Sequence, residues 1–258
     1  MTWLEQLAIL AAGVAAGGIN TIVGSGTLIT FPALLAFGLP PVTANVSNTV
    51  GLVPGSISGV IGYRRELAGQ RGRLLRLGSA SLLGGITGAL LLLWLPSDAF
   101  DAIVPVLIIA ALILVVVQPR LAAWVKRRRE ENTDAGVEAP KHGGPVLLGA
   151  VYLTGIYGGY FGAAQGVLLL GLLGVLVHED IQRLNAVKNV LALLVNAVAA
   201  AIFIMVAEVN WVVVALIAAG SIVGGQLGAR VGRKLPPNVL RAVIVVVGTI
   251  AVVRLLIT

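Results

Sequence analysis

The chain contains no cysteine, and it is poor in charged residues and histidine. Of its 258 residues, 11% are charged and two are histidines. The lack of thiols excludes disulfides, thiolate metal sites and cysteine nucleophiles. No Asp or Glu falls in the middle of an apolar segment, and no Walker motif, HExxH sequence or catalytic triad pattern is present. We therefore expect no enzyme, no metal site and no cofactor.

Hydrophobic residues make up 58% of the chain, which is typical of an integral membrane protein. Eight apolar segments are long enough to cross a bilayer, which takes about 20 residues. The second and seventh segments are too short and are predicted to be half-helices or re-entrant pieces. The segments comprise residues 3–23, 27–37, 41–62, 74–95, 99–118, 144–162, 166–177, 181–207, 209–229 and 237–257. The fold class predicted is an all-α polytopic membrane protein.

The second half of the chain repeats the first. A shift of 140 residues superposes identical glycine, asparagine and proline residues without a gap, which chance rarely produces. The matched pairs include Gly18/Gly158, Gly26/Gly166, Asn45/Asn185, Gly84/Gly224, Gly88/Gly228 and Pro96/Pro236. We therefore predict a first transmembrane repeat at 1–118, a charged flexible linker at 119–143 and a second transmembrane repeat at 144–258.

The basic residues predict the orientation of the segments. If all ten segments alternate, fifteen of the eighteen lysines and arginines fall on one side, which is the cytoplasm by the positive-inside rule. Each repeat has five segments, so the two repeats should be inverted with respect to each other. We expect a multi-pass protein of the bacterial inner membrane with both termini outside. The net charge of +7 then reflects topology and does not indicate nucleic-acid binding.

Two glycine-rich breaks precede the short segments. Gly24-Ser25-Gly26 precedes the second segment, and the sequence GAAQG at 162–166 precedes the seventh. A helix that begins inside the protein offers unpaired N–H groups and partial positive charge, which favour an anion. Candidate donors are Ser25, Gly26, Thr27, Gln165 and Gly166. We expect the two breaks to meet near the bilayer midplane; the alternative is that the glycines only permit close packing.

Two polar stripes lie on the segments that follow the short ones. Their members are spaced i, i+3, i+4 and i+11, which places them on one helix face, and the 140-residue shift superposes the two stripes. The stripes consist of Asn45, Asn48, Thr49 and Ser56 in the first repeat and Asn185, Lys188, Asn189 and Asn196 in the second. Lys188 is a candidate binding group for an anion. The alternatives are polar contacts that only hold helices together and a lysine that extends to the cytoplasmic surface.

The first glycine break, the Phe31-Pro32 pair after it and the degenerate second copy resemble the sulfite exporter TauE/SafE family, also called the toluene sulfonate uptake permease family. The resemblance covers essentially the whole chain. It implies a secondary carrier of sulfite, sulfonates or related anions. Thiosulfate-importing members use conserved cysteines, which this chain lacks.

The resemblance and the residues together predict a secondary transporter that exports sulfite or an organosulfonate across the plasma membrane by alternating access. Its partners would be this small anion and the lipid bilayer, with proton coupling left open as the energy source. The alternatives are an anion channel and a membrane assembly subunit that transports nothing.

Overall fold

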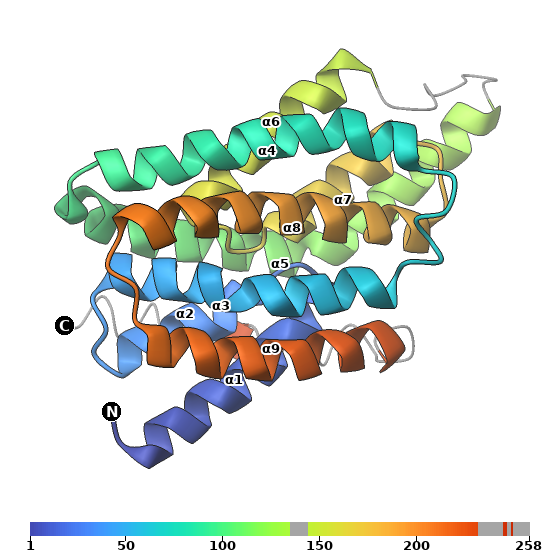
Figure 1. Cartoon of the computed structure of the whole chain (residues 1–258). Helices are drawn as coiled ribbons and strands as arrows, with labels where there is room; N and C mark the ends of the chain where they lie inside the picture. Colours follow the sequence, from blue (N-terminus) through green and yellow to red (C-terminus); the bar gives the residue numbers. More distant parts are fainter. Residues whose placement is uncertain (135–143, 232–244, 247–248, 250–258) are drawn as a thin grey trace.

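The computed structural model describes residues 1–134 and 144–231, together with 245, 246 and 249. The part of the chain described is folded into nine α-helices, which confirms the all-α prediction (Figure 1). The helices are α1 (Trp3–Ile22), α2 (Thr27–Ala36), α3 (Pro41–Gly62), α4 (Arg71–Trp94), α5 (Ser97–Asp134), α6 (Pro145–Tyr160), α7 (Gln165–Leu176), α8 (Ile181–Val206) and α9 (Trp211–Val231).

Five of the described helices, α1, α4, α5, α8 and α9, are long and apolar enough to cross a membrane. The two short apolar segments are confirmed: α2 has 10 residues and α7 has 12. Eight crossing segments were predicted, but α3 carries the polar stripe and α6 has only 16 residues, so neither meets this criterion. The tenth predicted segment, 237–257, lies almost wholly outside the described residues.

Helix α5 is longer than the sequence analysis predicted. It was expected to end at residue 118, with a flexible linker at 119–143, but the helix continues through Pro119 to Asp134. Its last part is rich in Ala, Arg, Lys and Glu, which favour helix even where the chain is too charged for lipid. The first part of the expected linker is therefore helical, and 135–143 lies outside the described residues.

The first helix of the chain packs against the last described one. A Cβ atom built on Gly17 of α1 would lie 2.4 Å from the Ser221 carbonyl oxygen of α9, and one on Gly224 of α9 would lie 1.9 Å from the Val14 carbonyl oxygen. Such distances are available only to glycine, so the two backbones touch. Contacts advance along both helices together, from Gly13 beside Ile217 to Gly17 beside Ser221, so α1 and α9 are parallel.

An equivalent pair forms between α4 and α6. A Cβ on Gly84 would lie 2.3 Å from the Tyr152 carbonyl oxygen, and one on Gly88 would lie 2.0 Å from that of Ile156. These helices are therefore also parallel and in backbone contact, and the GxxxG spacing of Gly84 and Gly88 permits this close packing. Helix α3 lies alongside α9, and α3 and α4 run in opposite directions across a short loop (Figure 1). Thus the first helix of each half packs on the fourth helix of the other half.

Candidate functional site

The two glycine-rich breaks are in direct contact. The N–H of Gly166 donates to the carbonyl oxygen of Gly24 at 3.0 Å. A Cβ on Gly24 would lie 2.3 Å from the Cα of Gly166, so no side chain fits between the two backbones. Gly24 also has φ +87°, a left-handed conformation that favours glycine. The contact confirms that the two breaks meet; their depth in the bilayer remains a prediction.

The first break lies beside the middle of α3. Asn48 donates through Nδ2 to Thr27 Oγ1 at 3.3 Å, just after the break. Asn20, just before the break, donates through Nδ2 to Ser56 Oγ at 3.4 Å. Asn48 and Ser56 are two turns apart in the 22-residue helix, so the break faces its central part.

Lys188 is fully buried and contacts the end of α1. Its Nζ donates to the carbonyl oxygen of Asn20 at 3.2 Å and to that of Thr21 at 3.3 Å. The last carbonyls of a helix have no partner within the helix and carry partial negative charge, so an ammonium group is favourable there. This geometry contradicts the alternative that Lys188 extends to the cytoplasmic surface. Its hydrogen bonds use two of three N–H groups.

Three asparagines of the stripes donate to a helix end of the other half. Asn185 and Asn189 on α8 donate to the Thr21 carbonyl oxygen at 3.4 and 3.3 Å, at the end of α1. Asn45 on α3 donates to the Tyr160 carbonyl oxygen at 2.9 Å, at the end of α6. Asn45 and Asn185, which are equivalent in the repeat, therefore make equivalent hydrogen bonds to the other half. Each fixes the end of the helix that leads into a break.

Several buried polar atoms near the breaks have no hydrogen-bond partner within the described residues. Most buried polar atoms in proteins do have one, so these atoms are candidates to bind a water molecule or a polar ligand. Ser25 and Gln165 stand next to the touching glycines and are 1% and 3% exposed. The atoms are Ser25 Oγ, Gln165 Nε2, Asn45 Oδ1, Asn185 Oδ1 and Tyr160 Oη. Both donors and acceptors are thus available beside the contact between the breaks.

Other candidate residues are placed less favourably. The N–H of Gly166, expected to bind an anion, is taken up by Gly24, and that of Gln165 donates to Gly162 at 3.2 Å. Thr49 is buried on α3, and Asn196 is half-buried two turns beyond Asn189 on α8. Among the described hydrogen bonds, none joins Thr49 or Asn196 to the breaks. The structure therefore gathers most of the predicted site, but not these two side chains.

Some contacts at the breaks were not predicted. Thr30 donates to Asn48 Oδ1, and its position one turn after Thr27 on α2 was the available signal. Phe31 and Phe161 meet edge to face with ring centroids 5.1 Å apart, and Phe100 lies 6.2 Å from Phe161. The carbonyl oxygens of Asn20, Thr21 and Tyr160 are backbone atoms, so no residue type in the sequence indicates them.

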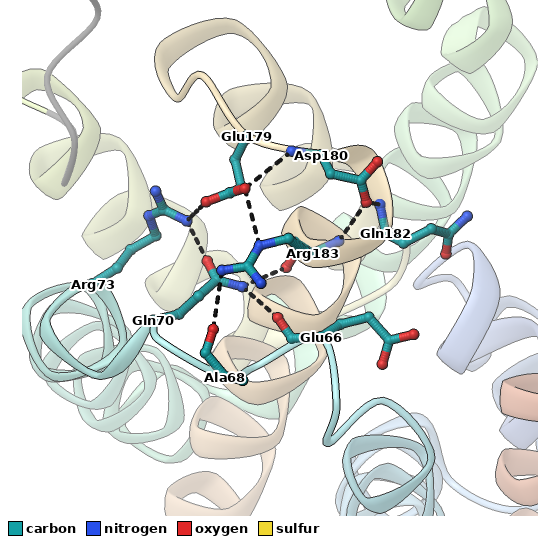
Figure 2. A network of polar contacts seen from close by, with 8 residues as sticks. All are labelled: Glu66, Ala68, Gln70, Arg73, Glu179, Asp180, Gln182 and Arg183. Carbon is teal, nitrogen blue, oxygen red and sulfur yellow. Dashed lines mark hydrogen bonds and ion pairs between the residues drawn. The ribbon is translucent and has the colours of Figure 1, made fainter.

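A second polar cluster joins the two halves at one end of the bundle (Figure 2). Glu179, in the loop between α7 and α8, accepts from Arg73 at 3.3 Å and from Arg183 at 2.9 Å. Arg183 also donates to the Ala68 carbonyl oxygen at 3.0 Å, in the loop between α3 and α4. Gln70 donates to the Arg183 carbonyl oxygen at 3.2 Å. We call these side chains, with Glu179 at their centre, the Glu179 network.

Charge in the Glu179 network favours the ionised carboxylate. Partial burial raises the pKa of Glu179, but the Asp180 N–H, the hydrogen bond from Arg73 and the positive charges of Arg183 and Arg73 outweigh burial. The pKa of Glu179 is therefore below its usual value of 4.5. Asp180 caps α8 by accepting from the N–H groups of Gln182 and Arg183. Within residues 1–134 and 144–231, no three His, Asp or Glu side chains gather into a metal site.

Comparison with known proteins gives consistent matches. The sequence model of the family described as "Sulfite exporter TauE/SafE" matches residues 9–255. The chain is 29% identical over 249 residues to the probable membrane transporter protein YfcA of Escherichia coli (strain K12), covering 93% of this chain and 86% of that protein. It is 27% identical over 248 residues to the probable membrane transporter protein ORF9 of Sinorhizobium sp., covering 96% and 91%. No solved structure matches significantly.

Proposed function

Because the chain belongs to the sulfite exporter TauE/SafE family of membrane transporters, we propose that it carries a small anion, sulfite or an organosulfonate, out of the cell by alternating access. Its relatives in bacteria carry the name of probable membrane transporter proteins, and five described helices can cross a membrane. The family is one of transporters and not of enzymes. The substrate, the direction and the mechanism are our proposal.

The observation that carries the proposal is the contact between the two breaks. Irregular backbone inside a membrane protein survives where protein or a polar cavity shields it from lipid, and in secondary transporters it marks the binding site. Here the contact is flanked by Ser25 Oγ and Gln165 Nε2, which lack hydrogen-bond partners among the described residues, and by the buried Lys188 side chain. Neutral donors next to a fixed positive charge suit a small oxyanion.

Alternating access in such transporters depends on two halves of opposite orientation. The packing supports this arrangement. Helices α1 and α9 are parallel, α4 and α6 are parallel, and α3, which lies alongside α9, runs opposite to α4 (Figure 1). In this proposal the 140-residue repeat is inverted, and the breaks lie near the midplane because α1 and α6 enter from opposite sides.

The proposed orientation is testable by cysteine labelling, since the chain has no native cysteine. Single cysteines at Asp98 and Glu208 should react with an impermeant maleimide added outside intact cells. Cysteines at Arg71 and Asn132 should react only after the cells are opened, because the basic loops remain in the cytoplasm. The loops that hold Arg71 and Glu208 are equivalent under the 140-residue shift, so labelling of both from the same side would contradict the inverted arrangement.

Transport itself is testable with purified protein in liposomes. Preloading with unlabelled sulfite should drive saturable uptake of radiolabelled sulfite, since a carrier exchanges substrate without net flow. Liposomes without protein provide the control. Ionic current without counterflow would indicate an anion channel, which is the alternative. If sulfite, taurine and sulfoacetate produce no current and no counterflow, the protein is an assembly subunit that transports nothing.

A further inference from the structure

We propose that Arg73 and Arg183 form an entry site for the anion, and that Glu179 closes this site by occupying the anion's place. The inference rests on the proposed function, because it assigns the route by which the transported anion reaches the breaks. The Glu179 network lies where α3 ends and α4 and α8 begin, which is the predicted cytoplasmic side (Figure 2).

The geometry at Glu179 is that of a bound oxyanion. Its two oxygens accept from two guanidinium groups, Arg73 at 3.3 Å and Arg183 at 2.9 Å. Guanidinium groups bind carboxylates and other oxyanions with the same N–H groups. Arg73 is only 6% exposed, so its positive charge is poorly screened by water. An oxyanion that displaced Glu179 would therefore find two directed donors already in position.

The Glu179 network also holds the two halves together. Arg73 belongs to α4 of the first half, whereas Glu179 and Arg183 belong to the second half. Arg183 contacts the α3–α4 loop through the Ala68 carbonyl oxygen. Release of Glu179 would thus break the link between α4 and the α7–α8 loop and remove the carboxylate that orients Arg183 beside Ala68. Lys188 is five residues further along α8, about 7.5 Å along the helix axis, so the entry site adjoins the proposed central site.

The opposite end of the bundle is closed differently. There the Asn210 N–H, in the loop between α8 and α9, donates to Ser47 Oγ of α3 at 2.9 Å. The ion pairs of Glu179 with Arg73 and with Arg183 lie at the other end, in the Glu179 network. Positive groups that attract an anion are therefore built into the closure on the predicted cytoplasmic side, as an exporter requires.

The test compares Glu179→Gln with Glu208→Gln, the same chemical change in the loop at the other end of the bundle. Glu179→Gln removes the competing charge but keeps the shape of the side chain. With sulfite applied from the α3–α4 loop side, its KM should fall about threefold or more, whereas Glu208→Gln should leave KM unchanged. Adding Arg183→Gln to Glu179→Gln should raise KM again. An unchanged or higher KM in Glu179→Gln would overturn the entry site.

A second measurement does not depend on transport. A cysteine pair at Ala68 and Gln182, on the two sides of the closure, should be joined readily by a short bifunctional maleimide. Glu179→Gln should slow this cross-linking about threefold or more, because the loops separate more often. An unchanged cross-linking rate would overturn the closure by Glu179, whether or not sulfite is transported. Slower cross-linking in a protein that moves no sulfite would refute the proposed substrate and keep the closure.

Discussion

Replacing Lys188 with alanine is expected to abolish sulfite counterflow in liposomes. Opposite charges about 4 Å apart gain about 4 kcal/mol at an effective dielectric near 20, so loss of the ammonium should weaken anion binding by about 100-fold or more. The protein should still fold. The Thr21 carbonyl oxygen keeps Asn185 and Asn189 as donors, and removal of a buried charge relieves its desolvation cost. Counterflow and the melting temperature in detergent are the two measurements.

Two further variants, one at Lys188 and one on the same face of α8, separate the effect of charge from that of packing. Lys188→Arg should retain part of the activity, because the charge survives while the shape changes. Asn196→Ala should weaken transport less, because it removes a neutral donor that is not joined to the breaks. Parent-level counterflow in Lys188→Ala would mean that Lys188 serves only to hold the end of α1. Ser25, Thr27 and Gln165 would then have to bind the anion without it.

Replacing Gly24 with alanine is expected to destabilise the protein most among the glycine changes at the site. The new Cβ would lie 2.3 Å from the Cα of Gly166, a backbone atom that cannot rotate away. Overpacking of this kind costs about 1–3 kcal/mol, and a left-handed alanine adds about 1–2 kcal/mol. Thermal unfolding in detergent should show a lower melting temperature, and the yield of folded protein should fall.

Gly38 provides the matched control. It has φ +81°, close to the +87° of Gly24, but a Cβ at Gly38 meets no atom within 4 Å. Gly38→Ala should therefore show only the cost of the backbone conformation, about 1–2 kcal/mol. Equal destabilisation by the two variants would contradict the close approach of the two breaks, because the clash with Gly166 should add a cost of its own.

Sequence reasoning predicts the parts of this fold that depend on local chemistry. Gly24 and Gly26 interrupt an apolar run, so a short helix beginning at Thr27 could be predicted from the sequence. The 3.6-residue period likewise places Asn45 and Asn48 on one face of α3. The end of α5 is not predicted correctly, because loss of hydrophobicity after residue 118 ends the apolar segment without ending the helix. Charged residues such as those at 126–131 are too polar for an apolar segment but continue a helix readily.

Other features depend on contacts between distant residues. The sequence singles out Lys188 as a buried cation, but its partners are backbone carbonyls 167 and 168 residues away. The sequence does not predict the Glu179 network either, because its partners are also distant in the chain. Glu179 is at the end of a segment, and only the folded chain brings it to Arg73, which is 106 residues earlier. Local pattern therefore predicts which side chains are polar and buried, and tertiary packing decides what they bind.

The hydrogen bonds that Asn45 and Asn185 make between the two halves affect how the protein inserts into the membrane and assembles. While the first half enters the membrane, the ribosome has yet to supply α8, so the carbonyl of Thr21 lacks the donors that later cover it. An uncovered carbonyl is costly in lipid and favours contact with water or headgroups. Helix α1 should thus remain loosely inserted until α8 and α9 arrive, and biogenesis should finish with the two halves locking together in one late step.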